Sequence, residues 1–502
     1  MKTQGDTKRP RSVKAEFEND FCASAHGGAV LVEKALRSLR LWRILKQHLP
    51  ARSDNAKYSM EEAASALIAS LLVGGKGIGA CEILREDKLA SNIFGVQAPS
   101  PSTTYRGLCD LAGLDERNAA DWYEPAGSRL PRLDMLGHPT KPSTLRRIVP
   151  ELAEAAPPDY LEQLNAFTSR LAIACAKSMP HKSMRLYGRP VIFGDATDLE
   201  VDGHCFDAAR MDRHGKQVLR WQTLSFGPLV FAQDLHEGNI DEGVSMPRLI
   251  EQSTASVREI AGRQRGMALL DGAYFEQAVI DAVSNKLRWD FIVGANQQRV
   301  ILTRLAQELN EGLWSDTGED ARRDWRASQV CCFTHLPGDW AKPVTIVARR
   351  WLNTDDLDGM WRYAFVATRI EPQDLPRALR KKHDYASAIW MLYSTKQGHE
   401  NYYKTPLRDF GLHHPPSCRL GVNQAFYTLA TAASNIAMVM RYRVVAKPER
   451  GIAFWRLRQR YFQIAGRVTV SAQRLTVFLA GGHIGAQRQV LWERAFAAAG
   501  RL

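Results

Sequence analysis

The sequence predicts a mixed α/β protein in which a sheet lies between helical regions at the two ends of the chain. Three observations support this fold class. Before residue 136, apolar residues recur at helical spacing. Between residues 190 and 294, short apolar runs alternate with helical stretches, which is typical of a mixed sheet. Residues 299–385 are rich in tryptophan and contain short alternating runs such as 344–348, so further strands are expected there.

The composition is that of a basic globular protein. The 502 residues carry a net charge of +13, with 45% hydrophobic and 24% charged residues, which excludes general disorder. Eight cysteines without a CxxC pair argue against a zinc ribbon or a secreted disulfide scaffold and favour a reducing compartment. The N-terminus has no apolar signal segment, and no apolar stretch is long enough to span a membrane. We therefore expect a soluble, cytoplasmic protein with no membrane partner.

Residues 1–136 are expected to form short helices. Ser59 and Glu62 give the pattern of a capping box before an Ala- and Leu-rich helix. The four glycines between residues 74 and 79 lack a preceding strand and a following GK[ST] sequence, so they indicate a turn and not a phosphate loop. A helix that begins at Ser102 and carries Arg106 fits either a helix-turn-helix-like DNA reader or a plain helical domain.

The middle of the chain begins after a proline-rich linker predicted over residues 137–158. An amphipathic helix over 160–177 follows, and Gly227-Pro228 marks the turn of a hairpin. These elements lead us to expect a mixed sheet from about residue 190 onward.

Two apolar strands of this region, 190–194 and 267–270, each end on an aspartate, Asp195 and Asp271. Functional residues of such sheets gather at strand ends. A carboxylate beside a buried strand end needs a cation or hydrogen bonds. The two aspartates are therefore candidate functional residues.

The stretch from Tyr393 to Leu412 carries a dense group of charged and polar residues. If it is helical, Tyr393, Glu400 and Lys404 lie near one face, and Lys396 lies one turn from Tyr393. An acid beside cations and a phenol suits a metal-bound phosphodiester, because Glu holds the ion and the cations meet phosphate oxygens. The alternative is an ordinary charged surface helix with i,i+4 pairs.

This stretch resembles the signature of insertion-sequence DDE transposases, in which Tyr is followed after two residues by a basic residue, after three more by Glu and after six more by Lys. Tyr393, Lys396 and Glu400 fit that spacing. Residue 407 is Leu, so Lys404 or Arg408 takes the last place. Further segments are similar to the insertion-sequence family thirteen-eighty, which is related to family four: 194–198 with the first aspartate, 270–272 with the second, 409–412, 415–417 and 423–429.

The resemblance implies an RNase H-like, retroviral-integrase-like catalytic core with a β-rich insertion, plus helical N-terminal and C-terminal regions. The chain then divides into a helical N-terminal DNA-binding region 1–136, a proline-rich linker 137–158, the first part of the core 159–298, the insertion 299–385, the second part of the core 386–440 and a basic C-terminal region 441–502.

The resemblance also assigns roles to residues. Tyr393, Lys396 and either Lys404 or Arg408 are expected to contact DNA. The catalytic residues and metal ligands are expected to be Asp195, Asp271 and Glu400. Two metal ions can activate water at a phosphodiester and stabilise the leaving oxygen, and carboxylate oxygens suit Mg²⁺ or Mn²⁺ better than zinc.

Other acidic and metal-ligating residues leave alternatives. Asp198 competes with Asp195 for the first position, and we prefer Asp195 because it directly follows the apolar strand. The pairs His204-Cys205 and His413-His414 have no matching second pair, so we expect both to be structural.

The excess positive charge is concentrated in residues 441–502, where twelve arginines and lysines face only Glu449 and Glu493, giving +10. Such a segment, interleaved with aromatic residues, suits a DNA backbone, although a solvated surface is the alternative. A helix over 487–499 is a candidate contact between two copies.

The function implied is a DNA transposase that hydrolyses phosphodiesters and transfers strands at the inverted-repeat ends of an insertion sequence. Its expected partners are double-stranded DNA of the ends and of the target, and a second copy in a synaptic complex. The implied location is the bacterial cytoplasm, with the nucleoid. The alternatives are a non-mobile metal-dependent nuclease, an inactive transposase-derived DNA-binding protein, and a glycosidase with paired carboxylates, against which the positive charge argues.

Overall fold

The computed structural model describes residues 23–52, 56–85, 87, 94, 97–114, 159–202, 206–212, 214–238, 242–317, 328–338, 340–352, 360–471, 474–480 and 485–502. Within these ranges some side chains, including those of Glu400 and Lys404, are not described. The expected linker 137–158 and the pair His204-Cys205 lie outside the described residues.

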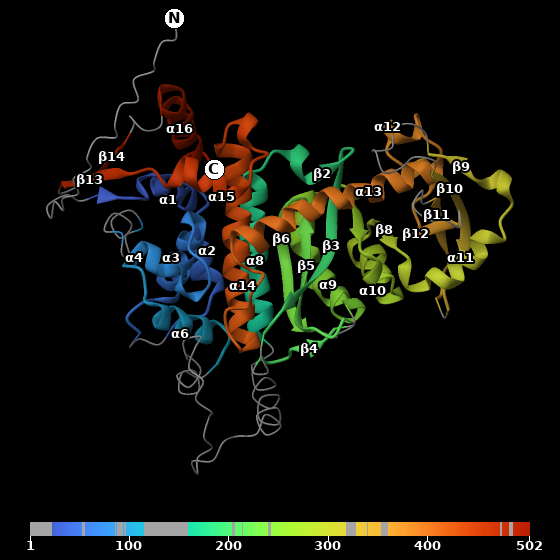
Figure 1. The fold of residues 1–502 in the computed structure, drawn as a ribbon, viewed down its shortest axis with the longest axis horizontal. Coiled ribbons are helices and arrows are strands. Elements are labelled where there is room, and N and C mark those ends of the chain that lie inside the picture. Colours follow the sequence, from blue (N-terminus) through green and yellow to red (C-terminus); the bar gives the residue numbers. More distant parts are fainter. Residues whose placement is uncertain are drawn as a thin grey trace, which may run out of the picture.

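One large sheet runs from the middle of the molecule, at β5 and β3, to the end formed by β9–β12 (Figure 1). Its strands follow the order β4-β5-β3-β7-β8-β12-β11-β10-β9, β6 pairs with β5, and β2 pairs with β3. The bounds are β2 (Arg185–Leu186), β3 (Arg189–Glu200), β4 (Arg210–Met211), β5 (Gln217–Phe226), β6 (Leu229–Glu237), β7 (Met267–Leu270), β8 (Asp290–Gly294), β9 (Ser315–Asp316), β10 (Ser328–His335), β11 (Val344–Leu352) and β12 (Trp361–Thr368).

The strand directions follow from the connections. The expected hairpin is present, because Gly227 with φ 54° turns β5 back into the antiparallel β6, and β5 is also antiparallel to β3. Strand β7 is parallel to β3, and β8 is parallel to β7. Such parallel pairs need crossovers, which α9 (Glu242–Ala261) and α10 (Gln277–Asp281) supply. Strand β12 then adds antiparallel to β8 and continues the sheet into the meander of β11, β10 and β9.

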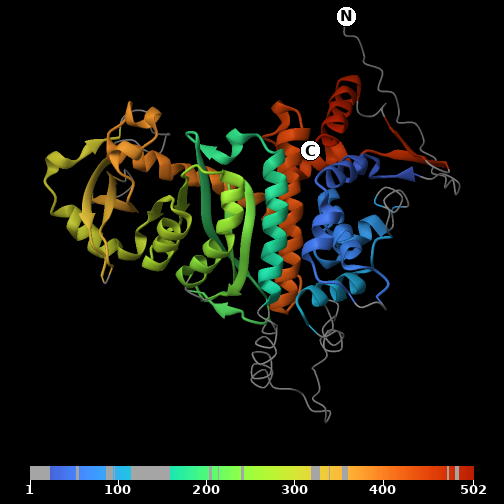
Figure 2. The ribbon, with the colours of Figure 1, turned by 180° about the vertical axis from the view of Figure 1, so that it is seen from behind.

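Helices cover both faces of the sheet. Helix α13 (Tyr385–Lys404) packs through its apolar residues on β3, β7, β8 and the strands that follow (Figure 1). Helices α8 (Asp159–Ser178), α9 and α14 (Leu420–Val439) cover the part of the sheet formed by β5 and β6. Figure 2 shows α8 and α14 side by side between the sheet and the N-terminal helices.

Helix side chains protect the outer edge of β6. An edge strand exposes backbone N–H and C=O groups that need partners. Asn435 of α14 accepts from the Val230 N–H at 3.0 Å and donates to the Val230 carbonyl at 2.7 Å. Gln424 accepts from Leu235 N–H, and Asn165 of α8 accepts from Gln233 N–H. The buried amides of two helices therefore close this edge.

The N-terminal helices and the C-terminal segment pack on α14 as one hydrophobic core. Their helices are α1 (Val30–Ser38), α2 (Leu41–His48), α3 (Met60–Val73), α4 (Glu82–Arg85), α6 (Pro101–Leu111), α15 (Phe454–Leu457) and α16 (Gly485–Ala499). The remaining short helices are α11 (Arg299–Gln307) and α12 (Arg377–Arg380).

The described parts of the terminal regions contain the expected helices and, in addition, three strands that were not expected. Strand β1 (Ala23–Ser24) pairs with β13 (Gly466–Ser471), which pairs with β14 (Arg474–Leu479). The alternation of Val468 and Val470 with polar residues suits a strand of a two-stranded ribbon, and the partner strand β1 comes from the other end of the chain. Only the tertiary fold brings these segments together.

Several local predictions are confirmed. Ser59 and Glu62 form the capping box of α3, and the glycine cluster lies in the turn between α3 and a short 3-10 helix, Ile78–Cys81, which includes Gly79. The helix expected from Ser102 begins one residue earlier, with Ser100 as its N-cap. In the described residues no single helix is long and apolar enough to cross a bilayer, although Met60–Val73 and Ile78–Arg85, bent by 87°, reach that length and composition together.

Candidate active site

The pairing register of two parallel strands sets the position of the candidate aspartates. The β3–β7 ladder ends at the pair Gly194 and Leu270, so the next residues, Asp195 and Asp271, leave the ladder at the same level. The expectation that Asp195 ends its strand was wrong. Strand β3 continues to Glu200 because β5 still pairs with it, and Asp195 marks the end of the parallel ladder only.

Strand alternation places both aspartates under α13. Val191 and Phe193 of β3, with Met267 and Leu269 of β7, form a cluster with apolar residues of α13. Because side chains of a strand alternate between faces, the residue two positions after Phe193 and the residue two positions after Leu269 point to that same face. The two carboxylates therefore continue an apolar stripe and face the catalytic-helix candidate.

Lys396 of α13 lies between the two carboxylates. Its Nζ is 3.6 Å from Asp195 Oδ2 and 3.8 Å from Asp271 Oδ1. The Lys396 side chain is 8% exposed, Asp195 is 14% exposed and Asp271 is 49% exposed. Two like charges side by side repel, and a shared cation offsets that repulsion. Lys396 thus sits inside the site and not on an outer helix face.

The backbone hydrogen bonds also hold the aspartates. Asp271 Oδ1 accepts from the Gly272 N–H at 2.8 Å, and Asp195 Oδ1 accepts from the Ala196 N–H at 3.0 Å. Each bond restrains a carboxylate rotamer, because the donor belongs to the next residue of the same chain segment.

Tyr393 lies one turn before Lys396 on the same helix. A Cβ added to Gly294, the last residue of β8, would lie 2.8 Å from the Tyr393 hydroxyl oxygen and 3.0 Å from the backbone of Gly272. The phenol therefore reaches the carboxyl end of β8, next to the segment that follows Asp271. Sequence reasoning missed Gly294; the signal was a glycine at the end of an apolar strand, where a close approach needs no side chain.

Glu400 lies on α13 one turn beyond Lys396, about 6 Å further along the helix axis. Ile389, Tyr393, Lys396 and Glu400 follow i, i+4, i+7 and i+11, which is the spacing of one helix face. The structure brings Asp195, Asp271 and Lys396 together. The convergence of the Glu400 side chain with them stays a prediction, because that side chain is not described.

The other basic residues of the motif lie at the end of α13. Helix α13 ends at Lys404 and continues as a π-helical turn, Thr405–Asp409, around Pro406. Arg408 pairs with Asp409 at 2.9 Å, and its side chain is 54% exposed. The side chain of Lys404 is not described, so the choice between Lys404 and Arg408 as the last basic position stays open.

Asp198, the alternative to Asp195 for the first acidic position, forms an ion pair outside the candidate site. Asp198 Oδ1 accepts from Arg220 Nε at 2.7 Å, and the two residues are cross-strand neighbours on β3 and β5. Three positions after Asp195, Asp198 lies on the other side of the strand. His413 and His414 have ring centroids 6.4 Å apart, and burial lowers the pKa of His413.

The donor set suits a hard divalent cation. Among the described side chains no group of three His, Cys, Asp or Glu residues could hold a metal ion, but Asp195 and Asp271 already share one cation, the Lys396 ammonium. Carboxylate oxygens without nearby sulfur or imidazole ligands fit Mg²⁺ or Mn²⁺. A third carboxylate from α13 would complete such a set, and Glu400 has the position for it.

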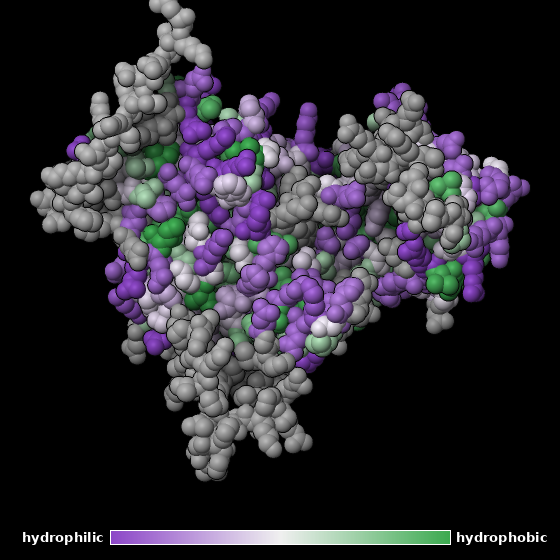
Figure 3. Space-filling view, viewed as in Figure 1, coloured by the Kyte–Doolittle hydropathy of each residue, from purple (hydrophilic) through white to green (hydrophobic). Residues whose placement is uncertain are grey.

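The surface around α13 is polar. Among the coloured residues of the face seen in Figure 3, hydrophilic residues prevail and small apolar spots are scattered between them. The exposed large apolar side chains of the segment after β8 include Val300, Ile301, Leu313, Leu336 and Met360. A polar face of this kind is compatible with a charged polymer as substrate.

Residues 207–494 match the protein family described as transposase DDE domain group 1, which is more than half of the chain. Asp271 and Glu400 lie within the matched span, and Asp195 precedes it. The chain is also similar to a structure described as the piggyBac transposase synaptic complex with hairpin DNA, solved by cryo-electron microscopy, with 9% identity, 86% of this chain and 76% of that chain covered, and a TM-score of 0.36. No protein with a curated description matches the chain.

Proposed function

This chain belongs to the transposases with a DDE domain of group 1 and is a DNA transposase, and we propose that Asp195, Asp271 and Glu400 are the acidic residues that carry its chemistry. The observation that carries this proposal is the position of Lys396 Nζ, 3.6 Å from Asp195 and 3.8 Å from Asp271. It joins residues from three distant parts of the chain at one point, one helical turn before Glu400.

We infer that the core is RNase H-like. The support is the order β6-β5-β3-β7-β8, in which the first three strands in the chain are antiparallel and the next two are parallel to β3. Helix α13 follows the β-rich segment 299–385 and returns to the face on which Asp195 and Asp271 lie. The β-rich segment is then an insertion that extends the core sheet through β12.

The three carboxylates would hold divalent cations, Mg²⁺ or Mn²⁺. When bound, such ions polarise the phosphodiester, activate water and stabilise the leaving oxygen. Asp195 and Asp271 each accept a hydrogen bond from the N–H group of the next residue, which restrains their carboxylates. Lys396 keeps the two carboxylates close in the free protein, and Tyr393 places a phenol beside the carboxyl end of β8.

The substrate that fits this arrangement is double-stranded DNA at the inverted-repeat ends of an insertion sequence, followed by target DNA. Tyr393, Lys396, and Lys404 or Arg408 are the residues of α13 and its π-helical extension that we assign to the DNA strand at the site. A pair of copies would hold two ends together, and the bacterial nucleoid is the location where such a substrate occurs.

Cleavage of labelled end DNA by conservative variants tests the assignment. Asp195→Asn, Asp271→Asn and Glu400→Gln should each lower the cleavage rate by about 10³-fold or more, because each removes a ligand from a shared charge site. DNA binding in a gel-shift assay without metal should change by less than about twofold. Asp198→Asn is the matched control, since its partner is Arg220, and it should cleave normally.

The opposite result would assign the first acidic position of the site to Asp198 instead of Asp195. Cleavage that survives in Asp195→Asn and disappears in Asp198→Asn contradicts the proposed site. Strand transfer distinguishes the alternatives, because a nuclease would cut end DNA without joining it to a target, and an inactive relative would bind without cutting. The family excludes the glycosidase.

A further inference from the structure

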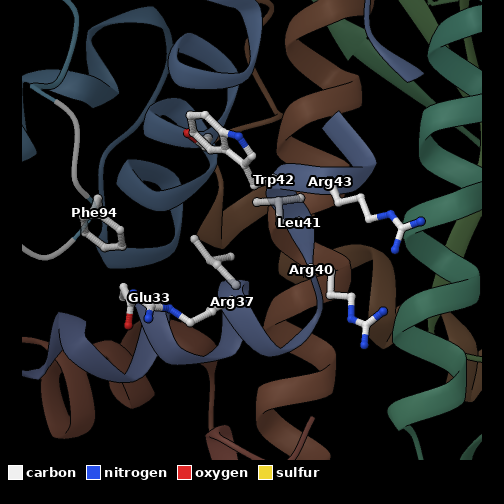
Figure 4. A pocket seen from close by; sticks show the side chains of 9 residues that line it. Glu33, Arg37, Arg40, Leu41, Trp42, Arg43 and Phe94 are labelled. Atoms are coloured by element: carbon white, nitrogen blue, oxygen red, sulfur yellow. Dashed lines mark hydrogen bonds and ion pairs between the residues drawn. The ribbon is translucent and has the colours of Figure 1, made fainter. Parts of the chain in front are cut away.

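A hollow and a chain of buried polar side chains are two features that the candidate active site does not use. The hollow, of about 400 Å³, lies among the N-terminal helices and has Trp42 in its wall. Figure 4 shows Arg40 and Arg43 extending away from Trp42, so these two guanidinium groups and the indole do not converge on one ligand. The polar chain lies between the sheet and α9, and its inner end is three residues after Asp271 in the sequence.

Gln222 of β5 and Tyr274 form the inner end of this polar chain. Both residues are fully buried, and Gln222 Nε2 donates to the Tyr274 hydroxyl oxygen at 3.3 Å. Gln222 Oε1 accepts from the Ser245 hydroxyl of α9 and lies 3.3 Å from His236 Nε2. Because the amide oxygen has these two neighbours, the NH₂ group of Gln222 is the end that faces the phenol.

The outer end of the polar chain is charged. His236 Nε2 is 3.6 Å from Asp234 Oδ2, and Arg248 of α9 pairs with the same carboxylate oxygen. The Asp234 side chain is 5% exposed and that of Arg248 is 52% exposed, so the chain runs from a surface cation to a phenol in the core. Buried polar groups are costly without partners, so each member restrains the orientation of the next.

Tyr274 lies against both segments that carry the candidate aspartates. Its N–H donates to the Asp271 carbonyl at 3.1 Å and closes the short 3-10 turn that begins after Asp271. A Cβ added to Gly194, the residue before Asp195, would lie 3.6 Å from Tyr274 Cε2. The ring therefore packs on β3 directly before Asp195. It does so from the face opposite to the Asp195 carboxylate, because successive side chains of a strand point to opposite faces.

The bond to Gln222 extends this contact to a third strand. Gln222 pairs with Ala196, the residue after Asp195, in the β3–β5 ladder. Tyr274 thus reaches from the end of β7 across β3 to β5. The β3–β7 ladder ends at Gly194 and Leu270, one residue before each aspartate. The contacts of Tyr274 continue the connection between the two strands past the end of that ladder.

We propose that Tyr274 is a positioning residue for DNA cleavage, which holds the turn of Asp271 so that this carboxylate stays level with Asp195. The inference rests on the proposed function, in which both carboxylates hold the same cations. Tyr274 is fully buried on the other face of the sheet, so it acts through Asp271 and does not touch DNA. A displacement of about 1 Å at a reacting group can lower a rate by about 10²-fold, so such a support contributes to catalysis.

Removal of one hydroxyl group in the full-length protein tests this role. Tyr274→Phe keeps the ring and loses the bond to Gln222. For cleavage of end DNA with Mg²⁺, kcat should fall by about tenfold, whereas KM for DNA should change by less than about twofold. Binding of Mn²⁺ in the absence of DNA, measured by electron paramagnetic resonance, should weaken by about tenfold, because the two carboxylates are held less firmly.

Tyr427→Phe is the matched control. Tyr427 is also fully buried, and its hydroxyl donates to the Leu412 carbonyl at 2.6 Å. Both variants lose one buried hydrogen bond, so their melting temperatures should fall by similar amounts. Tyr427→Phe should nevertheless keep kcat and Mn²⁺ affinity within about twofold of wild type, because its hydroxyl supports a different segment.

A second variant breaks the same bond from its other end. Gln222→Met removes the donor to Tyr274, and the double variant with Tyr274→Phe should cleave no more slowly than the slower single variant. Losses of kcat that multiply in the double variant would show that the two residues act separately and would contradict the proposal.

Two further results would overturn it. The first is a Tyr274→Phe protein with the kcat and Mn²⁺ affinity of wild type. The second is an equal loss of kcat in Tyr274→Phe and Tyr427→Phe, which would assign the effect to stability alone. Cleavage that survives in Asp271→Asn contradicts the proposed function, whereas normal cleavage by Tyr274→Phe beside an inactive Asp271→Asn contradicts only the role of Tyr274.

Discussion

At the scale of single residues, Lys396 of α13 influences how the candidate site is arranged before any ligand binds. Lys396 is 8% exposed and contacts carboxylates that come from β3 and from the end of β7. A buried ammonium without partners would be costly, and two adjacent carboxylates would repel each other, so each side stabilises the other. Lys396 is therefore an internal part of the site and not one cation of an exposed charged stripe.

Two substitutions of Lys396 distinguish the contribution of its charge to activity from the contribution of its side-chain shape. Lys396→Met keeps the apolar stem and removes the charge, so the two carboxylates repel, and cleavage of end DNA should fall by about 10²-fold. Lys396→Arg keeps a cation and should retain activity within about tenfold of wild type. Initial rates at saturating Mg²⁺ measure both. Lys381→Met, at an exposed position just after α12, is the control, and equal rates for Lys396→Met and wild type would contradict this role.

The burial of Asp207 leads us to predict how the free energy of unfolding depends on pH. Burial raises the pKa of Asp207 to about 6, although the Leu420 N–H and Arg419 lower it in part. Between about pH 4 and pH 6 the folded protein therefore binds more protons at this group than the unfolded chain, so the free energy of unfolding decreases as pH rises through this window. Above pH 6 the carboxylate destabilises the fold.

Asp207→Asn should consequently stabilise the protein at pH 7.5 by about 1–2 kcal/mol, after allowance for solvent screening, and should give no gain near pH 4. Thermal unfolding at the two pH values measures this difference. Asp212→Asn serves as a control that should not stabilise the protein at pH 7.5. Hydrogen bonds from the Lys216 and His214 N–H groups lower the pKa of Asp212, which is the opposite shift to that of Asp207. A gain for Asp207→Asn that is the same at both pH values would refute titration as its cause.

At the scale of elements, one buried arginine joins three segments that are far apart in the chain. Arg458 donates to the carbonyls of Leu71 and Leu72 at the end of α3, at 2.7 and 2.9 Å. It also donates to the carbonyl of Asp409, at the end of the π-helical turn after α13, at 2.6 Å. Burial lowers its pKa to about 10, and the rings of Phe410 and Phe454 lie against the guanidinium. The end of the segment that follows α13 is thus tied to an N-terminal helix.

The Arg458→Met variant should keep the packing between the two phenylalanines and lose all three hydrogen bonds. Buried carbonyls left without donors should lower the free energy of unfolding by about 3 kcal/mol or more. Urea unfolding followed by circular dichroism gives the value. Arg456→Met, at an exposed neighbour on α15, should change stability by less than about 0.5 kcal/mol. Similar losses in the two variants would mean that the buried bonds contribute little.

At the scale of the whole molecule, the cations of the basic C-terminal segment, residues 441–502, form two groups. Some are held by partners within the fold, and others are exposed. Arg458 lies in the core, Arg460 pairs with Glu449, and Arg450 donates to the Val445 carbonyl. The charge of +10 over 441–502 is therefore not all available to DNA. Removal of the whole segment would also remove β13, β14 and Arg458 from the fold, so truncation cannot test it.

Point substitutions of exposed cations test the DNA-backbone role without that damage. The triple variant Arg443→Gln, Arg456→Gln and Arg467→Gln should lower the slope of log affinity against log salt by about 3, equally for end DNA and unrelated DNA. Arg304→Gln, an exposed position on α11, serves as the comparison for a cation outside the segment. A slope that stays unchanged in the triple variant assigns these arginines to an ordinary solvated surface.

The sequence by itself determined the local elements and the identity of the chemical groups. The capping box of α3, the hairpin at Gly227 and the helix that carries Tyr393, Lys396 and Glu400 all follow from short-range rules of hydrogen bonding and periodicity. Strand alternation also held enough information to place Asp195 and Asp271 on the face of Phe193 and Leu269. These features depend on neighbours within a few positions.

The tertiary structure alone decided how those elements meet. The β3–β7 register puts Asp195 level with Asp271, and the packing of α13 brings Lys396 between them; both depend on contacts across more than seventy residues. The same holds for β1 with β13 and for Arg458 with α3, which join opposite ends of the chain. Charge counts cannot distinguish a buried arginine from an exposed one, because burial is decided by the packing of segments that are distant in sequence.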